Sequence, residues 1–228
     1  MNLHRFKYQE LFSGLYLTSM LACLVLFNRV TIIWDIPIVA SSLVLPIVYA
    51  IADIITEIYG YEIMRRLTWI TSGCLVIFSL FLETANSLPV DPAYKLDYEY
   101  RAVISPIFLV SILTVIALAS EQFINSYFLT KWKIIVRGKY FWLRCVGSTA
   151  IGSLAGVFIG YTNRLYLLPL EEALKFIFSA YIYYLICAVI LATPVTIVVS
   201  FLKKLEPKEA LNLSQINFNP FKLRDEIT

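Results

Sequence analysis

The stretch LPIVYAIADIITEIYGYEIMRR, residues 45–66, decides the fold, because it places two acids inside an otherwise apolar run. Asp53 and Glu57 are four residues apart, so a helix puts both on one face, and Tyr49 extends that face by another turn. An acid at bilayer depth is costly unless it faces protein, water or a partner. The pattern therefore predicts a membrane helix that lines a polar pathway or binding site. The structural alternative is that the acids pair with a buried arginine.

The composition agrees with a membrane protein. Hydrophobic residues make up 59% of the 228 residues and charged residues only 15%, against about 45–50% and about 25% in soluble domains. The polar start, MNLHRFKYQE, leads into an apolar stretch without a small-residue cleavage site, so we expect no removable signal peptide. The four cysteines are scattered one per hydrophobic segment, which favours packing roles over disulfides or a metal site.

Six hydrophobic stretches are long enough to cross about 30 Å of hydrocarbon at about 1.5 Å per residue. The second is the weakest, because it holds both acids and begins near Pro37 and Pro46, so a broken or re-entrant start is an open alternative. We expect an all-α, six-transmembrane-helix bundle over residues 1–205, followed by a polar, poorly ordered cytoplasmic tail, 206–228. The expected spans are 10–28, 38–59, 67–88, 103–130, 143–163 and 174–202.

The distribution of basic residues predicts the topology. Of the 19 lysines and arginines, 14 fall before the first span, after the last, or in the loops on that same side of the six spans. Cytoplasmic loops collect Lys and Arg, so both termini are predicted to be cytoplasmic. Two basic ends on one side also require an even number of spans.

The fourth span carries polar residues at helical spacing. Gln122, Asn125 and Ser126 share one face. Amides offer both a donor and an acceptor, which suits recognition of a neutral heterocycle. Hydrogen bonding between helices is the structural alternative, and the spacing leaves both open.

Charged residues near the expected helix ends have simpler interpretations. Glu121 is placed near the basic loop that follows the fourth span, so we expect a salt bridge with Lys131 or Arg144. Arg65 and Arg66 are interpreted as cytoplasmic anchors. Gly60, after the run of residues 45–59, is predicted to cap the helix that carries the two acids.

The fifth span, WLRCVGSTAIGSLAGVFIGY, repeats small residues every four positions. Ser148, Gly152, Gly156 and Gly160 form a face that lets a second helix backbone approach closely. A flat ligand lying against bare backbone is the alternative, and the two are compatible.

The sixth span offers aromatic residues, and the chain offers no catalytic motif. Tyr184 is expected either to stack on a planar ligand or to sit in the core or at the interface, and Pro194 is expected to kink its helix. There is no P-loop, HExxH or CxxC, and His4 is the single histidine. We therefore expect no catalytic residues, no metal and no cofactor.

Two blocks of the sequence resemble a known family. The run PIVYAIADIITEIYGYEIMRR resembles the signature of the queuosine precursor transporter family, also called the putative vitamin uptake transporter family. The shared features are a proline, an Asp and a Glu spaced by four, a Tyr-Gly pair and an arginine. WLRCVGST, residues 142–149, resembles a second family block, and the likeness covers most of residues 8–205.

The resemblance implies a fold like that of the substrate-binding subunits of energy-coupling-factor vitamin transporters. It implies a cell inner membrane importer of deazaguanine or queuine-type precursors of queuosine, a modified tRNA nucleoside. Asp53 and Glu57 would accept hydrogen bonds from ring N–H groups, and Gln122 would form hydrogen bonds with another edge of the heterocycle. The expected substrate-binding residues are Tyr49, Asp53, Glu57, Gln122, Asn125, Ser148 and Tyr184. Expected partners are the heterocycle, the lipid bilayer, and either a second copy or an energising subunit, with no nucleic acid.

The sequence also departs from the family pattern at polar positions. Asn125 stands where the family places an Asp, Ser153 and Gly156 stand where it places a Gln and an Asp, and Leu109 replaces an arginine. The resemblance therefore predicts the transported molecule less directly than it predicts the fold. Two other functions remain open: a substrate-capturing subunit that needs a separate ATPase, and a membrane enzyme or assembly factor.

Overall fold

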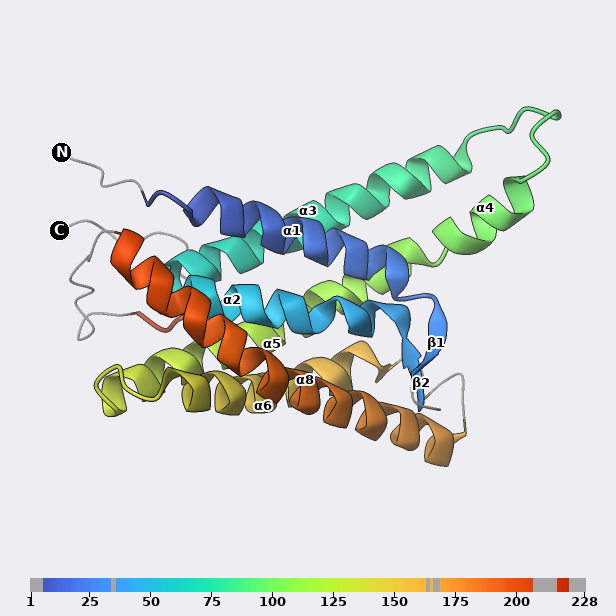
Figure 1. Ribbon diagram of the computed structural model, residues 1–228. Coiled ribbons are helices and arrows are strands. Elements are labelled where there is room, and N and C mark those ends of the chain that lie inside the picture. Colours follow the sequence, from blue (N-terminus) through green and yellow to red (C-terminus); the bar gives the residue numbers. More distant parts are fainter. Residues whose placement is uncertain (1–5, 34–35, 163–164, 166–168, 207–216, 222–228) are drawn as a thin grey trace.

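The computed structural model of the protein describes residues 6–33, 36–162, 165, 169–206 and 217–221. These residues form a bundle of helices with one small β-hairpin (Figure 1). The helices are α1 Gln9–Leu26, the 3-10 helix η1 Ala40–Leu43, α2 Leu45–Tyr59, α3 Tyr61–Ser87, α4 Asp97–Ile104, α5 Ile107–Ile135, α6 Phe141–Gly160 and α8 Leu170–Leu205.

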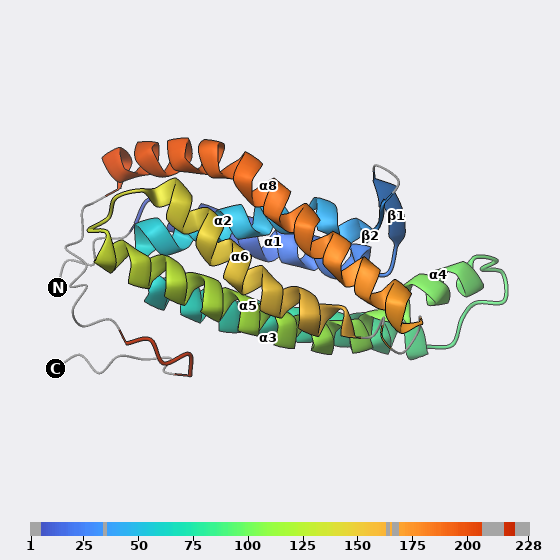
Figure 2. The ribbon, with the colours of Figure 1, turned by 90° about the horizontal axis from the view of Figure 1, so that it is seen from below.

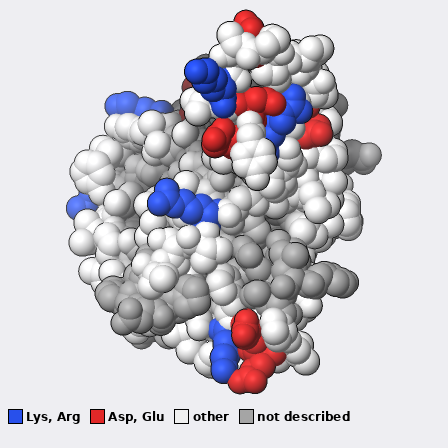
Figure 3. Space-filling model, turned by 90° about the vertical axis from the view of Figure 1, so that its right-hand side faces the viewer, with Lys and Arg blue, Asp and Glu red and all other residues white. Residues whose placement is uncertain are grey.

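The chain runs back and forth along the bundle, so that α1 begins and α8 ends at the same end (Figure 1). We call this the basic end; its described basic residues are Lys7, Arg65, Arg66, Lys131, Lys133, Arg137, Lys139, Arg144, Lys203 and Lys204. The opposite end, which we call the hairpin end, carries β1, β2 and α4. Figure 3 shows this end as a mostly uncharged surface on which basic and acidic side chains gather in small mixed groups.

Five segments among the described residues are long and apolar enough to cross a membrane. They are α1, α3, α4 with α5, α6 and α8. Large apolar side chains such as Phe81, Leu109 and Ile197 are exposed on them, whereas Asp53 and Glu57 are buried inside. This distribution, opposite to that of a water-soluble protein, confirms a helical membrane bundle. The second predicted span does not reach the same length, since α2 has only 15 residues.

The second predicted span, 38–59, is broken at its start. Strand β1, Val30–Ile33, pairs antiparallel with β2, Ile36–Val39, and η1 follows before α2 begins. This hairpin is not among the elements expected from the sequence, although β-branched residues dominate both strands. Pro37 is tolerated in β2 because each strand of a two-stranded ribbon has a free edge.

Gly60 separates α2 from α3, as the sequence predicts. Its φ of 92° and ψ of 166° lie outside the range that other residues adopt easily. The polar face of α2 therefore stops at Glu57, and Tyr61 begins the next helix, where its hydroxyl donates to the carbonyl of Phe218 at 3.1 Å.

The small-residue face of α6 packs against α5, which confirms the predicted close approach of two helices. A Cβ added at Gly152 would lie 2.9 Å from Cβ of Asn125 and 3.0 Å from the carbonyl oxygen of Glu121. At Gly160 the nearest contact would be an ordinary 3.6 Å to Ala117. The tightest backbone approach is therefore in the middle of the helix pair.

Glu206 joins the first and last helices at the basic end. Its carboxylate accepts hydrogen bonds from the backbone N–H of Lys7 at 3.0 Å and of Tyr8 at 2.8 Å, directly before α1. The hydroxyl of Tyr59 donates to the same carboxylate at 3.0 Å, which adds the end of α2. A carboxylate is stable there because helix N-termini attract negative charge.

Residues 217–221 pack against the basic ends of α3 and α5. The guanidinium of Arg65 donates to the carbonyls of Asn217 at 2.7 Å and Asn219 at 3.1 Å. The indole of Trp69 donates to the carbonyl of Pro220 at 2.8 Å. Arg65, expected to be a cytoplasmic anchor, is only 1% exposed and holds residues 217–221 against α3.

Helix α8 remains helical through Pro194. It bends along its length (Figure 2), so that it follows α2 and α6 on one side of the bundle.

Substituting Gly152 with alanine is expected to destabilise the bundle by about 1–3 kcal/mol, because the new methyl group meets backbone and Cβ atoms of α5. Thermal unfolding in detergent, followed by tryptophan fluorescence, measures the change. Gly14→Ala is the matched control, since no atom lies within 4 Å of its added Cβ. Equal melting temperatures for the two variants would contradict the close packing of α5 and α6.

Candidate functional site

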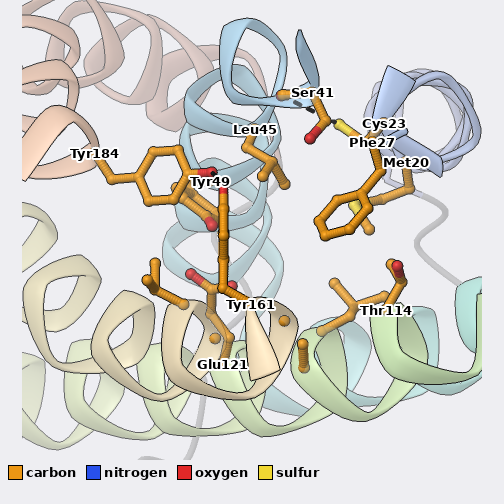
Figure 4. Close-up of a pocket in the computed structure, with 15 residues that line it drawn as sticks. Met20, Cys23, Phe27, Ser41, Leu45, Tyr49, Thr114, Glu121, Tyr161 and Tyr184 are labelled. Carbon is orange, nitrogen blue, oxygen red and sulfur yellow. Dashed lines mark hydrogen bonds between the residues drawn. The ribbon is translucent and has the colours of Figure 1, made fainter. Parts of the chain in front are cut away.

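A cavity of about 50 Å³ lies in the half of the bundle nearer the hairpin end. Figure 4 shows that side chains from α1, η1, α2, α5, α8 and the end of α6 surround it. Binding sites for small molecules commonly measure about 300–1,000 Å³, so a planar ligand would require the lining helices to move apart. The lining residues are Met20, Cys23, Phe27, Ser41, Leu45, Tyr49, Thr114, Ala117, Leu118, Glu121, Gly156, Val157, Gly160, Tyr161 and Tyr184.

Tyrosine hydroxyls form a small cluster at one wall of the cavity. Tyr184 lies 2.9 Å from the Ser42 hydroxyl and 3.1 Å from that of Tyr161, and Ser42 and Tyr161 are 3.3 Å apart. The ring of Tyr184 also meets that of Tyr49 edge to face, with centroids 5.9 Å apart. The cluster fixes the aromatic rings, so the wall presents both ring faces and hydroxyl groups.

Glu121 is the acid that faces this cavity. It lies at the middle of α5, 14 residues from each end, is 6% exposed, and points toward Tyr49 and Tyr161 (Figure 4). Its carboxyl group lies beside the Tyr49 side chain. The predicted salt bridge with Lys131 or Arg144 is wrong. Because α5 extends to Ile135, five residues beyond the predicted end of this span, Glu121 lies farther from the basic loop than expected.

Asp53 lies one turn along α2 from Tyr49 and is fully enclosed, with 1% exposure. Its carboxylate accepts hydrogen bonds from the Asn125 amide at 2.7 Å, the Cys145 thiol at 2.8 Å and the Thr149 hydroxyl at 3.3 Å. It also lines a small void of about 10 Å³ between α2, α6 and α8. Cys145 is therefore a donor to a buried acid and has more than the packing role expected of it.

Glu57 lies one further turn toward the basic end, within an ionic cluster. Its carboxylate pairs with Arg144 at 3.1 Å, Lys133 at 3.5 Å and Lys203 at 2.5 Å. Lys133 also donates to the backbone carbonyl of Glu57 at 2.8 Å. The pairing with a buried arginine, the structural alternative of the sequence analysis, holds for Glu57 but not for Asp53. The cluster ties together α2, α5, α6 and α8.

Helices α2 and α5 run in the same direction, which explains the regular pairing between them. Tyr49 meets Glu121, and Asp53 meets Asn125, so a step of four residues on one helix matches a step of four on the other. Next to this series, the hydroxyls of Thr56 and Ser126 lie 3.3 Å apart. The polar side chains of α2 and α5 thus face each other along the contact between these two parallel helices. We call this line of side chains the polar seam.

Two buried amides beside this seam retain hydrogen-bonding capacity. Neither the oxygen nor the nitrogen of the Gln122 side chain, which is 0% exposed, has a partner among the described residues. The oxygen of Asn125 is likewise without one there. Leaving buried amide atoms unpaired costs about 1–3 kcal/mol each. Such groups are natural binding points for water or a ligand.

The seven predicted substrate-binding residues are all buried, but they occupy different places. Tyr49 and Tyr184 line the cavity. The other five do not line it: Asp53, Glu57, Gln122, Asn125 and Ser148. Ser148 donates its hydroxyl to the carbonyl of Cys145 at 3.2 Å within α6.

Three residues of this region are absent from the expected substrate-binding set. For Glu121, the sequence predicts a contact with the basic loop instead. Ser42 and Tyr161 lie at a 3-10 helix and a helix end, where periodicity carries little signal. The pairing of Glu121 with Tyr49 could have been found by aligning the two polar segments in parallel.

Comparison with known protein families identifies the family of this chain. Residues 39–199 match the family model described as putative vitamin uptake transporter. The matched range spans η1 to α8 and includes Tyr49, Asp53, Glu57 and Glu121. No curated protein and no solved structure matches the chain.

Glu57→Gln is expected to destabilise the protein by about 3–5 kcal/mol, because it leaves buried Arg144 and two lysines without their anion. Chemical denaturation in detergent measures the loss. Glu171→Gln is the matched control, because it breaks an exposed pair with Lys175 worth less than about 1 kcal/mol. A Glu57→Gln protein as stable as the control would show that the cluster contributes nothing to folding.

Proposed function

Because the chain belongs to the putative vitamin uptake transporter family, we propose that it imports a small planar heterocycle of the queuosine precursor class, a deazaguanine or queuine-type molecule. The observation that carries this proposal is the polar seam between α2 and α5. It holds acids, amides and tyrosines inside a bundle whose outer surface is apolar. Polar groups at membrane depth that face inward mark a pathway or a ligand site.

The proposed importer crosses the cell inner membrane six times. Five segments qualify by length and apolarity, and η1 with α2 provides a sixth crossing, since together they rise about 30 Å, the thickness of the hydrocarbon core. The fold proposed is that of the substrate-binding subunits of energy-coupling-factor transporters. The basic end is assigned to the cytoplasm by its lysines and arginines, which puts both termini there.

Transport requires the cavity to open alternately to the two sides. The cavity lies toward the hairpin end, which is the outer side in this orientation. The ionic cluster of Glu57 lies between the cavity and the cytoplasm, so it is the barrier that closes the inner side in this conformation. Asp53 lies between the two, where a ligand passing inward would exchange hydrogen bonds with it and with Gln122.

The chemistry of the site suits a deazaguanine. Such a ring presents several N–H donors at one edge and a carbonyl acceptor beside them, which complement carboxylates and amides respectively. The Tyr49 and Tyr184 rings supply faces for a planar molecule. The tRNA modification would then depend on salvage of the imported precursor inside the cell.

Asp53→Asn is expected to reduce uptake to background, because the amide no longer accepts from Cys145 and Thr149 as the carboxylate does. The measurement is complementation of a queuosine-auxotrophic strain supplied with each precursor in turn, scored by tRNA modification. Asp97→Asn, in α4 at the hairpin end, is the matched control and should retain uptake. Both variants are checked for equal insertion into the membrane. Full modification by the Asp53 variant would remove this residue from the transport mechanism.

Reconstitution of the purified chain alone in liposomes separates the importer from a substrate-capturing subunit. Uptake of the precursor without any other protein is the expected result. If uptake appears only when an ATPase module is added, the chain is the capturing subunit of a larger importer.

A further inference from the structure

We propose that Glu121 recognises a protonated amine on the transported molecule. The inference rests on the proposed function, because it assigns the ligand chemistry of the same cavity. Glu121 lines the cavity from the middle of α5 and is only 6% exposed. Its side chain points into the space shown in Figure 4.

One oxygen of Glu121 has no hydrogen-bond partner among the described residues. This oxygen, Oε1, is buried. The carboxyl group also lies beside the Tyr49 side chain. A buried carboxylate is strongly disfavoured without a compensating charge or donor. The free oxygen therefore marks the position that a donor group of the ligand would occupy.

No cation of the described part of the chain pairs with Glu121. Of the buried basic residues, Arg144 and Lys133 pair with Glu57, and Arg65 donates to the carbonyls of Asn217 and Asn219, all at the basic end. Lys133 is three turns further along α5, about 18 Å away along the helix axis. The other polar groups that face the cavity are hydroxyls and a thiol, namely those of Ser41, Thr114, Tyr49, Tyr161, Tyr184 and Cys23. The cavity therefore carries an acid without its own counter-charge.

Gly156 makes room for this acid. A Cβ at this position would lie 2.7 Å from Cδ of Glu121, so only glycine lets the carboxyl group lie against α6. The rings of Tyr49, Tyr161 and Tyr184 stand around the same space. An anion surrounded by aromatic faces is a favourable site for an ammonium group, since the ring faces also attract cations.

Two kinds of deazaguanine differ in the group that Glu121 would recognise. One kind carries a neutral nitrile on the five-membered ring, and another carries an aminomethyl group that is protonated at neutral pH. The two are nearly equal in size, so size gives little discrimination. Glu121 would favour the aminomethyl compound, because hydrogen bonds to charged groups are worth about 1.5–3 kcal/mol, or about tenfold or more in affinity.

The test compares uptake of the two deazaguanines into liposomes containing the full chain, each competing with the other. The wild-type protein should prefer the aminomethyl compound by about tenfold or more, and Glu121→Gln should reduce this preference to within about twofold. Glu172→Gln, at the exposed start of α8, is the matched control and should keep the wild-type preference. Equal uptake of both compounds by the wild-type protein, or an unchanged preference in Glu121→Gln, overturns the inference.

A second measurement does not depend on the cargo. Benzylamine and benzyl alcohol are similar in shape, and only the amine is charged. Benzylamine should raise the melting temperature of the detergent-solubilised wild-type protein more than benzyl alcohol does, and Glu121→Gln should remove the difference. If neither deazaguanine is taken up but the benzylamine result holds, the queuosine assignment fails and amine recognition stands. If benzylamine stabilises both proteins equally, amine recognition fails.

Discussion

The structure depends on how an apolar bundle tolerates carboxyl groups at its centre. Each of the three acids on the seam between α2 and α5 has a different solution. Glu57 is neutralised by three cations, and Asp53 is surrounded by neutral donors. Glu121 lies beside Tyr49 and has one oxygen without a partner in the described part of the chain. Their degree of compensation falls from the basic end toward the cavity. The least compensated acid is the one that faces the cavity, where a ligand can supply the missing hydrogen-bond donor or positive charge.

The glycine face of α6 packs directly against the polar face of α5. A close approach of two helices usually serves packing alone. Here Gly152 lets the backbone of α6 reach Asn125 and the carbonyl of Glu121, while Gly156 leaves space for the Glu121 side chain. Asn125 therefore lies against Gly152 and Glu121 against Gly156, so polar residues on two successive turns of α5 both rest on glycines of α6.

Periodicity predicted most of the helices, because spans of apolar residues leave few alternatives in a membrane. It also predicted the shared face of Asp53 and Glu57 and the cap at Gly60. It could not predict the β-hairpin before α2, where short β-branched runs read equally well as helix. Nor could it identify the partner of Glu57, since Arg144 is 87 residues away and only tertiary packing brings it close. Helix ends were uncertain by several residues, and that error was enough to misplace Glu121.

The hydrogen bonds of Glu206 have a mechanical consequence. They join the start of α1, the end of α2 and the residue that follows α8 at the basic end. If α1, α2 and α8 moved together away from α5 and α6, Glu57 would lose its ion pairs with Arg144 and Lys133 and keep the one with Lys203. Such a movement would also have to break the packing of α8 on α6.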